Sequence, residues 1–326
     1  MSMGVRLMQW SEYIVLFGRS AFGKLGNIRI YLHRLKYVDQ CLQLENRDRG
    51  QAIGGVIFVS MVSTLVILTA TVIKVYDNIT EQDRVLWYMT YLTYTVICTL
   101  VSPHFTLLVM ELLLRYRELN RQLVLTICPN TGTAGCENDC LTDILLYEPE
   151  LSQRSRDANI NDLRAAYAVL HRAAETLQQH YGPAATSMVA GAFFGVIYSS
   201  YEIIALLVED VGINTGVLSH SLLGSSLWLA YHGVKLVAVS MCCAAACDEE
   251  RRTGVLLHRA ATAFALCGTP LPEAEAFLHE VRRGPPLNFT AGGFFHIHRS
   301  LVISTLATVI THIVILTQFG IEPSRA

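Results

Sequence analysis

The sequence predicts an all-α, polytopic membrane helix bundle with long cytosolic helix extensions. Of the 326 residues, 52% are hydrophobic and only 16% are charged, whereas soluble domains are nearer to a quarter charged. The apolar residues form blocks long enough to cross a bilayer, which takes about 20 residues. Helical periodicity continues in the polar segments beyond these blocks. Together these observations indicate membrane helices that project out of the bilayer.

Apolar blocks mark the expected spans. Five of them have the required length and composition: 54–76, 85–114, 184–208, 220–247 and 301–319. The stretch YIVLF near the N-terminus is too short to cross alone. We find no charged start followed by a small-residue cleavage site, so no signal peptide is expected. The sequence therefore predicts five clear spans plus a stub.

Basic residues set the expected orientation. Lysines and arginines gather in 1–53, 115–183 and 248–300, whereas the loops on the other side hold one arginine against five acids. By the positive-inside rule these three segments are cytosolic. The N-terminus is then cytosolic, and the tail 320–326 is extracellular. Segment 54–114 forms two membrane helices, and so does segment 184–247.

Two cytosolic segments have helical patterns of their own. One buried stripe is expected on the helix that precedes the third span, at Leu163, Ala166, Tyr167, Leu170, Ala174 and Leu177. Residues 115–124 prolong the second span, and 273–283 form a short amphipathic helix. Residues 128–160 are rich in Gly, Asn and Cys, which predicts an irregular loop.

Composition argues against several function classes. A net charge of −2 gives no basis for nucleic-acid binding. Cys128, Cys136 and Cys140 suggest zinc, but no histidine or fourth cysteine has ligand spacing. Free thiols fit the nine scattered cysteines better. No nucleophile–base pattern or phosphate-binding glycine loop occurs, so we expect neither an enzyme nor a cofactor. The GxxxG motif at 191–195 indicates close helix packing.

Aromatic and ionisable residues cluster in the outer halves of the spans. Such residues inside a membrane usually face a cavity or a partner, and this composition suits a small organic ligand. The candidate ligand-binding residues are Tyr91, Tyr94, Tyr198, Tyr201, Glu202, Trp228, Tyr231 and His232. Trp87 and Tyr88 fit an aromatic belt at the membrane interface better than a pocket.

The last span has one mildly polar face. Thr308, Thr311, Ile315, Gln318 and Glu322 recur at helical spacing. This face suits a water-filled pore, in which rings of Phe319 or Ile315 would close the path by dewetting while Gln318 solvates ions. Bonding between membrane helices is the alternative explanation, because Thr and Gln often make such contacts. The residues alone leave both open.

The end of this span resembles a family signature. Insect gustatory receptors close on T-Y-x5-Q-F, and here 311–319 read THIVILTQF, with His312 in place of Tyr. The lead-in NFTAGGFFHIHRSLV and the cytosolic segments LLRYRELNRQL and LRAAYAVLHRAAETLQQHYGP are also similar to the family. The similarity runs from about residue 30 to residue 319.

The resemblance implies a seven-helix receptor channel that assembles as a tetramer. Segment 248–300 would belong to a shared cytosolic anchor domain, and 184–247 would form part of the ligand pocket. The helix 301–319 would line the pore through Thr311, His312, Ile315, Gln318 and Phe319. Residues 5–40 resemble the inner end of the family's second helix. We therefore expect a truncated N-terminus, with 1–53 as a remnant of that helix and a cytosolic segment.

The expected function follows from the same resemblance. It is a taste receptor of the plasma membrane, a tastant-gated non-selective cation channel in a homo- or heterotetramer with other gustatory receptor subunits. Ile313 stands where the sugar-sensing branch carries Glu, which favours bitter compounds over sugars. One alternative is a truncated non-conducting subunit that assembles with full-length receptors. An unrelated transporter would need an inverted repeat, which the sequence does not show.

Overall fold

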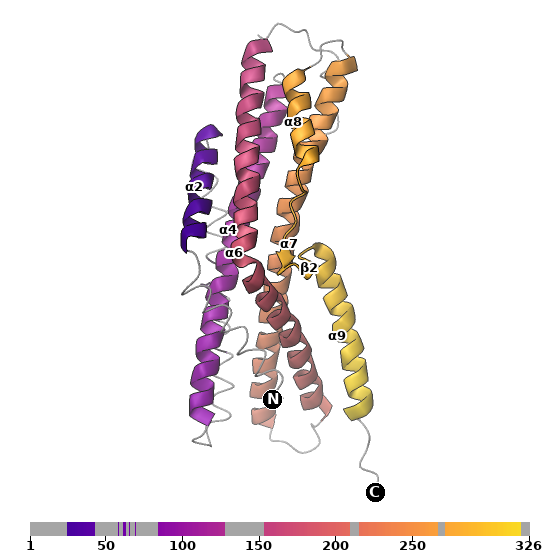
Figure 1. Ribbon diagram of the computed structural model, residues 1–326. Helices are drawn as coiled ribbons and strands as arrows, with labels where there is room; N and C mark the ends of the chain where they lie inside the picture. Colours follow the sequence, from indigo (N-terminus) through magenta and orange to yellow (C-terminus); the bar gives the residue numbers. More distant parts are fainter. Residues whose placement is uncertain are drawn as a thin grey trace.

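The computed structural model describes residues 25–42, 84–127, 153–208, 215–266 and 271–320, with five single positions between 58 and 69. Within these ranges the chain forms six helices and one two-stranded hairpin (Figure 1). In chain order they are α2 (Leu25–Cys41), α4 (Arg84–Ile127), α6 (Gln153–Val208), α7 (Thr215–Leu266), α8 (Pro272–Arg283), β1 (Thr290–Ala291), β2 (Phe295–His296) and α9 (Arg299–Gly320). The prediction of an all-α bundle is confirmed, with the hairpin as its one addition in the described part.

Three long helices form the body of the molecule. Helices α4, α6 and α7 contain 44, 56 and 52 residues and pack on one another along their length (Figure 1). At 1.5 Å per residue each is more than about 65 Å long, roughly twice the hydrocarbon thickness of a bilayer. The expectation that membrane helices continue beyond the bilayer is therefore confirmed.

Apolar spans are found on two of these helices within the described residues. Asn159–Leu207 and Leu222–Leu266 are long and apolar enough to cross a membrane, and Arg299–Ile315 is a shorter apolar helix. The predicted spans 184–208 and 220–247 overlap the first two, except for residue 208 and residues 220–221 at their ends. The predicted span 54–76 lies outside the described residues, except that Phe58, Met61, Val62, Leu65 and Thr69 are helical and exposed. The N-terminal stub also lies outside them.

Helix α6 differs from its prediction at two places. It begins at Gln153, inside the segment predicted as an irregular loop over 128–160. The reason is that the buried stripe already starts at Ile160, so the roughly two turns ahead of it can stay helical. The helix also continues through Pro183, and it changes direction near its middle (Figure 1). Proline removes one helical hydrogen bond and bends a helix without always ending it.

The upper half of the bundle is the part that includes α8 in Figure 1, and the lower half is the part that includes α9. The core of the upper half is buried within one chain. All six stripe residues predicted on α6 are at most 5% exposed. The amphipathic helix predicted at 273–283 is present as α8, and it buries Ala274, Phe277 and Leu278. The ring of Phe277 meets that of Tyr167 edge-on at 5.5 Å between centroids. Periodicity thus predicted which side chains build this core.

A short hairpin turns the chain from α8 towards α9. Thr290 pairs with His296, and Ala291 pairs with Phe295. Gly292 and Gly293 form the turn with φ of 59° and 85°, a conformation that favours glycine. The hairpin docks on α6, because Gly292 N donates to Gly182 O at 3.0 Å and Gln178 Nε2 donates to Thr290 O at 2.6 Å. It therefore fixes the start of α9 against the bend of α6.

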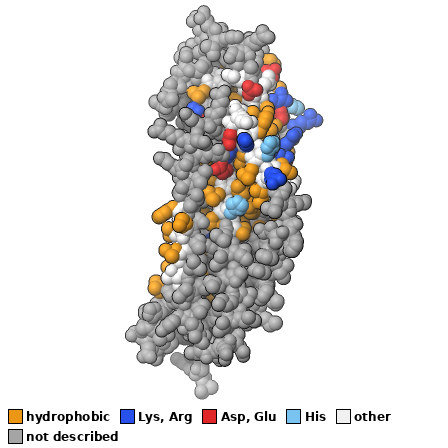
Figure 2. Space-filling model, turned by 90° about the vertical axis from the view of Figure 1, so that its left-hand side faces the viewer, with side chains coloured by type: hydrophobic (Ala, Val, Ile, Leu, Met, Phe, Trp, Pro, Cys, Tyr) orange, Lys and Arg blue, Asp and Glu red, His pale blue; other side chains and the backbone are white. Residues whose placement is uncertain are grey.

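Charged side chains are unevenly distributed along the molecule. On the face that carries α2, described acidic, basic and histidine side chains gather in the upper part, and hydrophobic ones extend below them (Figure 2). The cytosolic assignment of the upper half rests on the basic segments of the sequence. The uneven distribution of charge agrees with that assignment.

Candidate functional site

Helices α6 and α7 approach closely in the lower half of the bundle. A Cβ placed on Gly195 would lie 2.5 Å from Cγ and Cδ2 of the His232 ring, nearer than real Cβ contacts come. The GxxxG motif at 191–195 therefore does what its pattern predicts, since the absent side chain lets the facing helix come close. His232, predicted to bind a ligand, lies at this contact.

An aromatic cluster surrounds this contact on α7. The ring centroids of Trp228 and His232 are 5.2 Å apart, those of Tyr231 and His232 are 5.0 Å apart, and those of Trp228 and Tyr231 are 6.0 Å apart. Trp228 and Tyr231 are 7% and 9% exposed. The spacing i, i+3, i+4 places all three on one helix face, and their rings lie together there.

A carboxylate from α6 lies beside this cluster. Ser225 Oγ donates to Glu202 Oε2 at 2.8 Å, and the serine is fully buried. Trp228 follows Ser225 by three residues, so the carboxylate lies about one helical turn from the indole. A buried hydroxyl that holds an ionisable group beside aromatic rings is typical of a site for small organic molecules. Sequence reasoning missed Ser225, whose one signal was its place one turn before Trp228.

The remaining predicted ligand residues are less closely joined. Tyr198 is half-buried and Tyr201 is 42% exposed. Tyr91 and Tyr94 lie on α4, but their side chains are outside the described part of the chain. The structure therefore brings together Glu202, Ser225, Trp228, Tyr231 and His232 as the candidate ligand site.

Helix α9 has an unusually large exposed surface. It contacts α6 and α7, and its buried side chains in the described part are Thr305 and Val309, each 5% exposed. Four apolar side chains of α9 are between 47% and 70% exposed: Ile303, Leu306, Ile310 and Val314. The predicted pore residues Thr311, His312, Ile315 and Gln318 are also exposed. The side chain of Phe319, and the whole of Glu322, lie outside the described residues.

Polar side chains of α9 are bonded to their own helix. Thr308 Oγ1 donates to Ser304 O at 2.8 Å, and Thr311 Oγ1 donates to Ala307 O at 2.9 Å. His312 Nδ1 lies 2.9 Å from Thr308 O. Such bonds lower the cost of a hydroxyl in an apolar setting. They also leave the oxygen lone pairs able to accept from water, as a pore lining would require.

The upper end of α9 is tied to the long helices. Arg299 Nη2 lies 2.8 Å from Asp248 Oδ2 of α7, and the hairpin binds α6 just before. The lower end of α9 stands apart from the ribbon of the bundle (Figure 1).

Buried polar groups lock the upper half of the bundle. Asn120 Nδ2 donates to Glu249 O at 2.9 Å, and Asn120 Oδ1 accepts from Thr253 Oγ1 at 2.7 Å. Tyr167 Oη donates to Glu250 Oε1 at 2.7 Å; burial first, and the neighbouring carboxylate second, raises the pKa of Tyr167 well above its ordinary value. Burial raises the pKa of Tyr181 to about 12. These phenols are therefore neutral donors at physiological pH.

The described part of the chain contains free thiols and no cluster of metal-ligating side chains. Among its residues no group of three His, Cys, Asp or Glu side chains is arranged to hold a metal ion. Cys41, Cys242, Cys243 and Cys247 are free thiols. The zinc candidates Cys128, Cys136 and Cys140 lie outside the described residues.

Comparison with known proteins identifies the family. Residues 20–323 match the family model described as 7tm Chemosensory receptor. The fold is similar to the insect olfactory receptor OR5 from Machilis hrabei in complex with eugenol, at a TM-score of 0.55 and 12% identity over 97% of this chain and 79% of that one. A second structure of OR5 from Machilis hrabei gives a TM-score of 0.54 and 13% identity over the same shares. None of the curated proteins matches the sequence. The chain belongs to the 7tm chemosensory receptor family and is a multi-pass membrane receptor, not an enzyme.

Proposed function

We propose that this protein is a gustatory receptor, a tastant-gated non-selective cation channel subunit of the plasma membrane. In this proposal the N-terminus is cytosolic, the C-terminus is extracellular, and four subunits surround one pore. The observation that carries the proposal is the exposed surface of α9. Lipid can cover the apolar side chains of a membrane helix, but the exposed polar stripe of α9 needs water or another subunit.

The exposed surface of α9 divides into two stripes. At 3.6 residues per turn, Ile303, Leu306, Ile310 and Val314 share one stripe, and Thr311, Ile315 and Gln318 share another about a quarter of a turn away. Thr305 and Val309 face the bundle. Three different environments would satisfy these three faces: the chain's own bundle, an apolar neighbour, and water. A helix at a subunit interface beside a pore meets all three.

The ligand would bind beside the aromatic cluster of α7. Glu202 with its Ser225 donor supplies one polar anchor, and Trp228, Tyr231 and His232 supply aromatic faces. This composition suits a small aromatic or basic organic compound better than a sugar, which needs many hydroxyl partners. Bitter compounds are therefore the proposed ligands, ahead of sugars.

Coupling to the pore would run through α6 and α7. The same two helices carry the candidate ligand site and the two attachments of α9, at Gly182 and Asp248. A ligand that binds the open arrangement more tightly than the closed one would shift the population towards opening. No further moving part is required.

The test is a whole-cell current recording from cells that express the chain, with bitter compounds and sugars applied. We expect a ligand-evoked cation current that Gln318→Ala and Phe319→Ala both alter, while Leu306→Ala on the apolar stripe changes it less. Glu202→Gln should shift the ligand concentration dependence and leave the ion selectivity unchanged. Absence of current from a chain shown to reach the surface would contradict the proposal for the chain alone. Co-expression with full-length receptors would then test the non-conducting subunit.

A further inference from the structure

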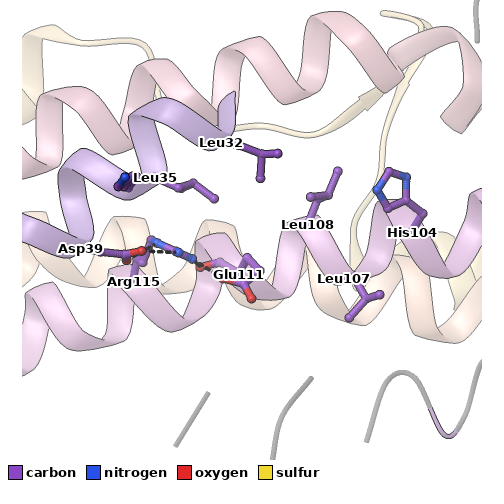
Figure 3. Close-up of a pocket in the computed structure, with 9 residues that line it drawn as sticks. Leu32, Leu35, Asp39, His104, Leu107, Leu108, Glu111 and Arg115 are labelled. Atoms are coloured by element: carbon purple, nitrogen blue, oxygen red, sulfur yellow. Dashed lines mark hydrogen bonds and ion pairs between the residues drawn. The ribbon is translucent and has the colours of Figure 1, made fainter. Parts of the chain in front are cut away.

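A cavity of about 420 Å³ lies between α2 and α4, apart from the candidate ligand site (Figure 3). Helix α2 packs closely on α6 but meets α4 at few points. Hydrogen bonds join α2 to α4: Tyr31 Oη donates to Leu108 O at 2.7 Å, and Arg115 Nε donates to Asp39 Oδ1 at 2.8 Å. Just past the end of α2, Gln122 Nε2 of α4 donates to Leu42 O at 2.5 Å. The cavity fills the gap that remains between these helices.

The cavity is apolar at one end and charged at the other. Because Tyr31 meets Leu108 and Asp39 meets Arg115, the two helices run in the same direction. Leu32, Leu107, Leu108 and His104 lie towards one end, and Asp39, Glu111 and Arg115 lie towards the other (Figure 3). Lys36, three residues before Asp39 on α2, also lines the cavity. The stretch from His104 to Arg115 is about 17 Å long. Arg115 also falls just past the predicted inner end of the second span, so the charged end lies at the cytosolic membrane surface.

The charged end carries both signs. Lys36 and Arg115 are opposed by Asp39 and Glu111, so the formal charges cancel. Arg115 is 2% exposed, and its guanidinium is held by both Asp39 oxygens, at 2.8 and 3.0 Å, and by Glu111. A purely anionic headgroup would meet two carboxylates here. A headgroup with a phosphate and a primary ammonium matches the site, because the carboxylates retain lone pairs for N–H donors.

We propose that this cavity binds a phosphatidylethanolamine molecule of the inner leaflet. One acyl chain packs among the leucines, the phosphate lies near the exposed Lys36, and the ammonium donates to Asp39 or Glu111. The exposed side chains of Ile30 and Leu32, 46% and 51% exposed, provide an apolar rim next to the bilayer. The bound lipid would fill the gap and fasten α2 to α4.

The experiment uses the full chain in phosphatidylcholine nanodiscs with a trace of phosphatidylethanolamine that carries a photoreactive acyl chain. After irradiation, labelled peptides are mapped by mass spectrometry. We expect labelling of α2 and of α4 near Leu107, reduced at least threefold by excess unlabelled phosphatidylethanolamine. Extra phosphatidylcholine, which lacks N–H donors, should compete poorly, and inorganic phosphate should not compete.

Two variants and one control separate a bound lipid from lipids that merely surround the protein. Leu107→Trp fills the cavity, and Leu223→Trp adds the same ring at an exposed leucine of α7. Lys36→Gln removes one phosphate partner with little risk to folding. Labelling near Leu107 should fall severalfold in Leu107→Trp and in Lys36→Gln, and it should stay unchanged in the control Leu223→Trp. Equal labelling in all three, uniform labelling of every apolar face, or competition by inorganic phosphate alone would overturn the proposal.

Discussion

The upper and lower halves of this protein are stabilised in different ways. In the upper half, buried polar groups of one helix are bonded to another, as in Tyr167 with Glu250 and Asn120 with Glu249, and Phe277 of α8 closes the core. In the lower half, α9 leaves Ile303 70% exposed and Ile310 61% exposed. The upper half therefore completes its core within one chain, whereas α9 needs lipid or other copies of the chain.

This difference makes a general point about ligand-gated membrane receptors. Buried hydrogen bonds between helices favour one arrangement, because a shift would leave their donors and acceptors unpaired. An apolar helix with few contacts can move at small cost. We therefore expect α9 to be the moving part and the upper half to be the fixed frame.

The largest effect is expected at Arg115 in the upper half. Arg115→Met leaves Asp39 and Glu111 without their common cation, and loss of one partner from a buried ion pair costs about 3–5 kcal/mol. Arg117→Ala is the matched control, because Arg117 is 55% exposed and such pairs are worth about 0–1 kcal/mol. Thermal unfolding in detergent, followed by circular dichroism, measures both. Equal losses of stability in the two variants would show that burial does not make Arg115 contribute more than Arg117.

A second effect is expected where α6 and α7 touch in the lower half. Gly195→Ala places a methyl group 2.5 Å from the His232 ring, and overpacking of this kind costs about 1–3 kcal/mol. Gly233→Ala, which meets nothing within 4 Å, should be neutral or slightly stabilising. Addition of His232→Ala should relieve the clash. If Gly195→Ala alone has the same unfolding free energy as the parent chain, the two helices do not approach as closely as described.

The hairpin between the two halves should show a smaller effect. Gly292→Ala forces a side chain into a φ of 59° and places its Cβ 2.6 Å from Thr186 Oγ1, which costs about 1–2 kcal/mol for the backbone alone. Gly293→Ala has similar backbone strain at φ 85° but open space, so it isolates the contact. Limited proteolysis between α8 and α9 should increase more for Gly292→Ala. Identical cleavage would contradict docking of the hairpin on α6.

The smallest effect is expected from a half-exposed pair on α4. Burial alone raises the pKa of Glu118, but hydrogen bonds from Arg121 and Gln122 lower it below its usual value overall. A lowered pKa in the folded state gives stability that is present above the unfolded value and lost as the pH falls through the folded one. Glu118→Gln should therefore cost less than about 1 kcal/mol at pH 7 and nothing in strong acid. A cost that grew on acidification would contradict this sign.

Local patterns predicted the parts of the fold that depend on one helix at a time. Spacing gave the buried stripe of α6, the amphipathic helix α8 and the aromatic cluster of α7. Contacts between helices could not be read in this way. The pairing of Glu202 with Ser225, the passage of α6 through Pro183 and the gap between α2 and α4 depend on the placement of neighbouring helices. In the sequence, the hairpin is indicated by the pair Gly292–Gly293, which favours a tight turn.

The central claim is that the polar stripe of α9 lines a pore, and cysteine accessibility tests it most directly. A charged, membrane-impermeant thiol reagent is applied outside cells during ligand-evoked currents, with single cysteines at Thr311, Gln318 or Val309. We predict rapid block with Gln318→Cys and Thr311→Cys, faster when ligand is present. Val309→Cys, buried against the bundle, should behave like the parent chain with its native cysteines. Block at Val309 together with no effect at Thr311 and Gln318 would contradict the claim.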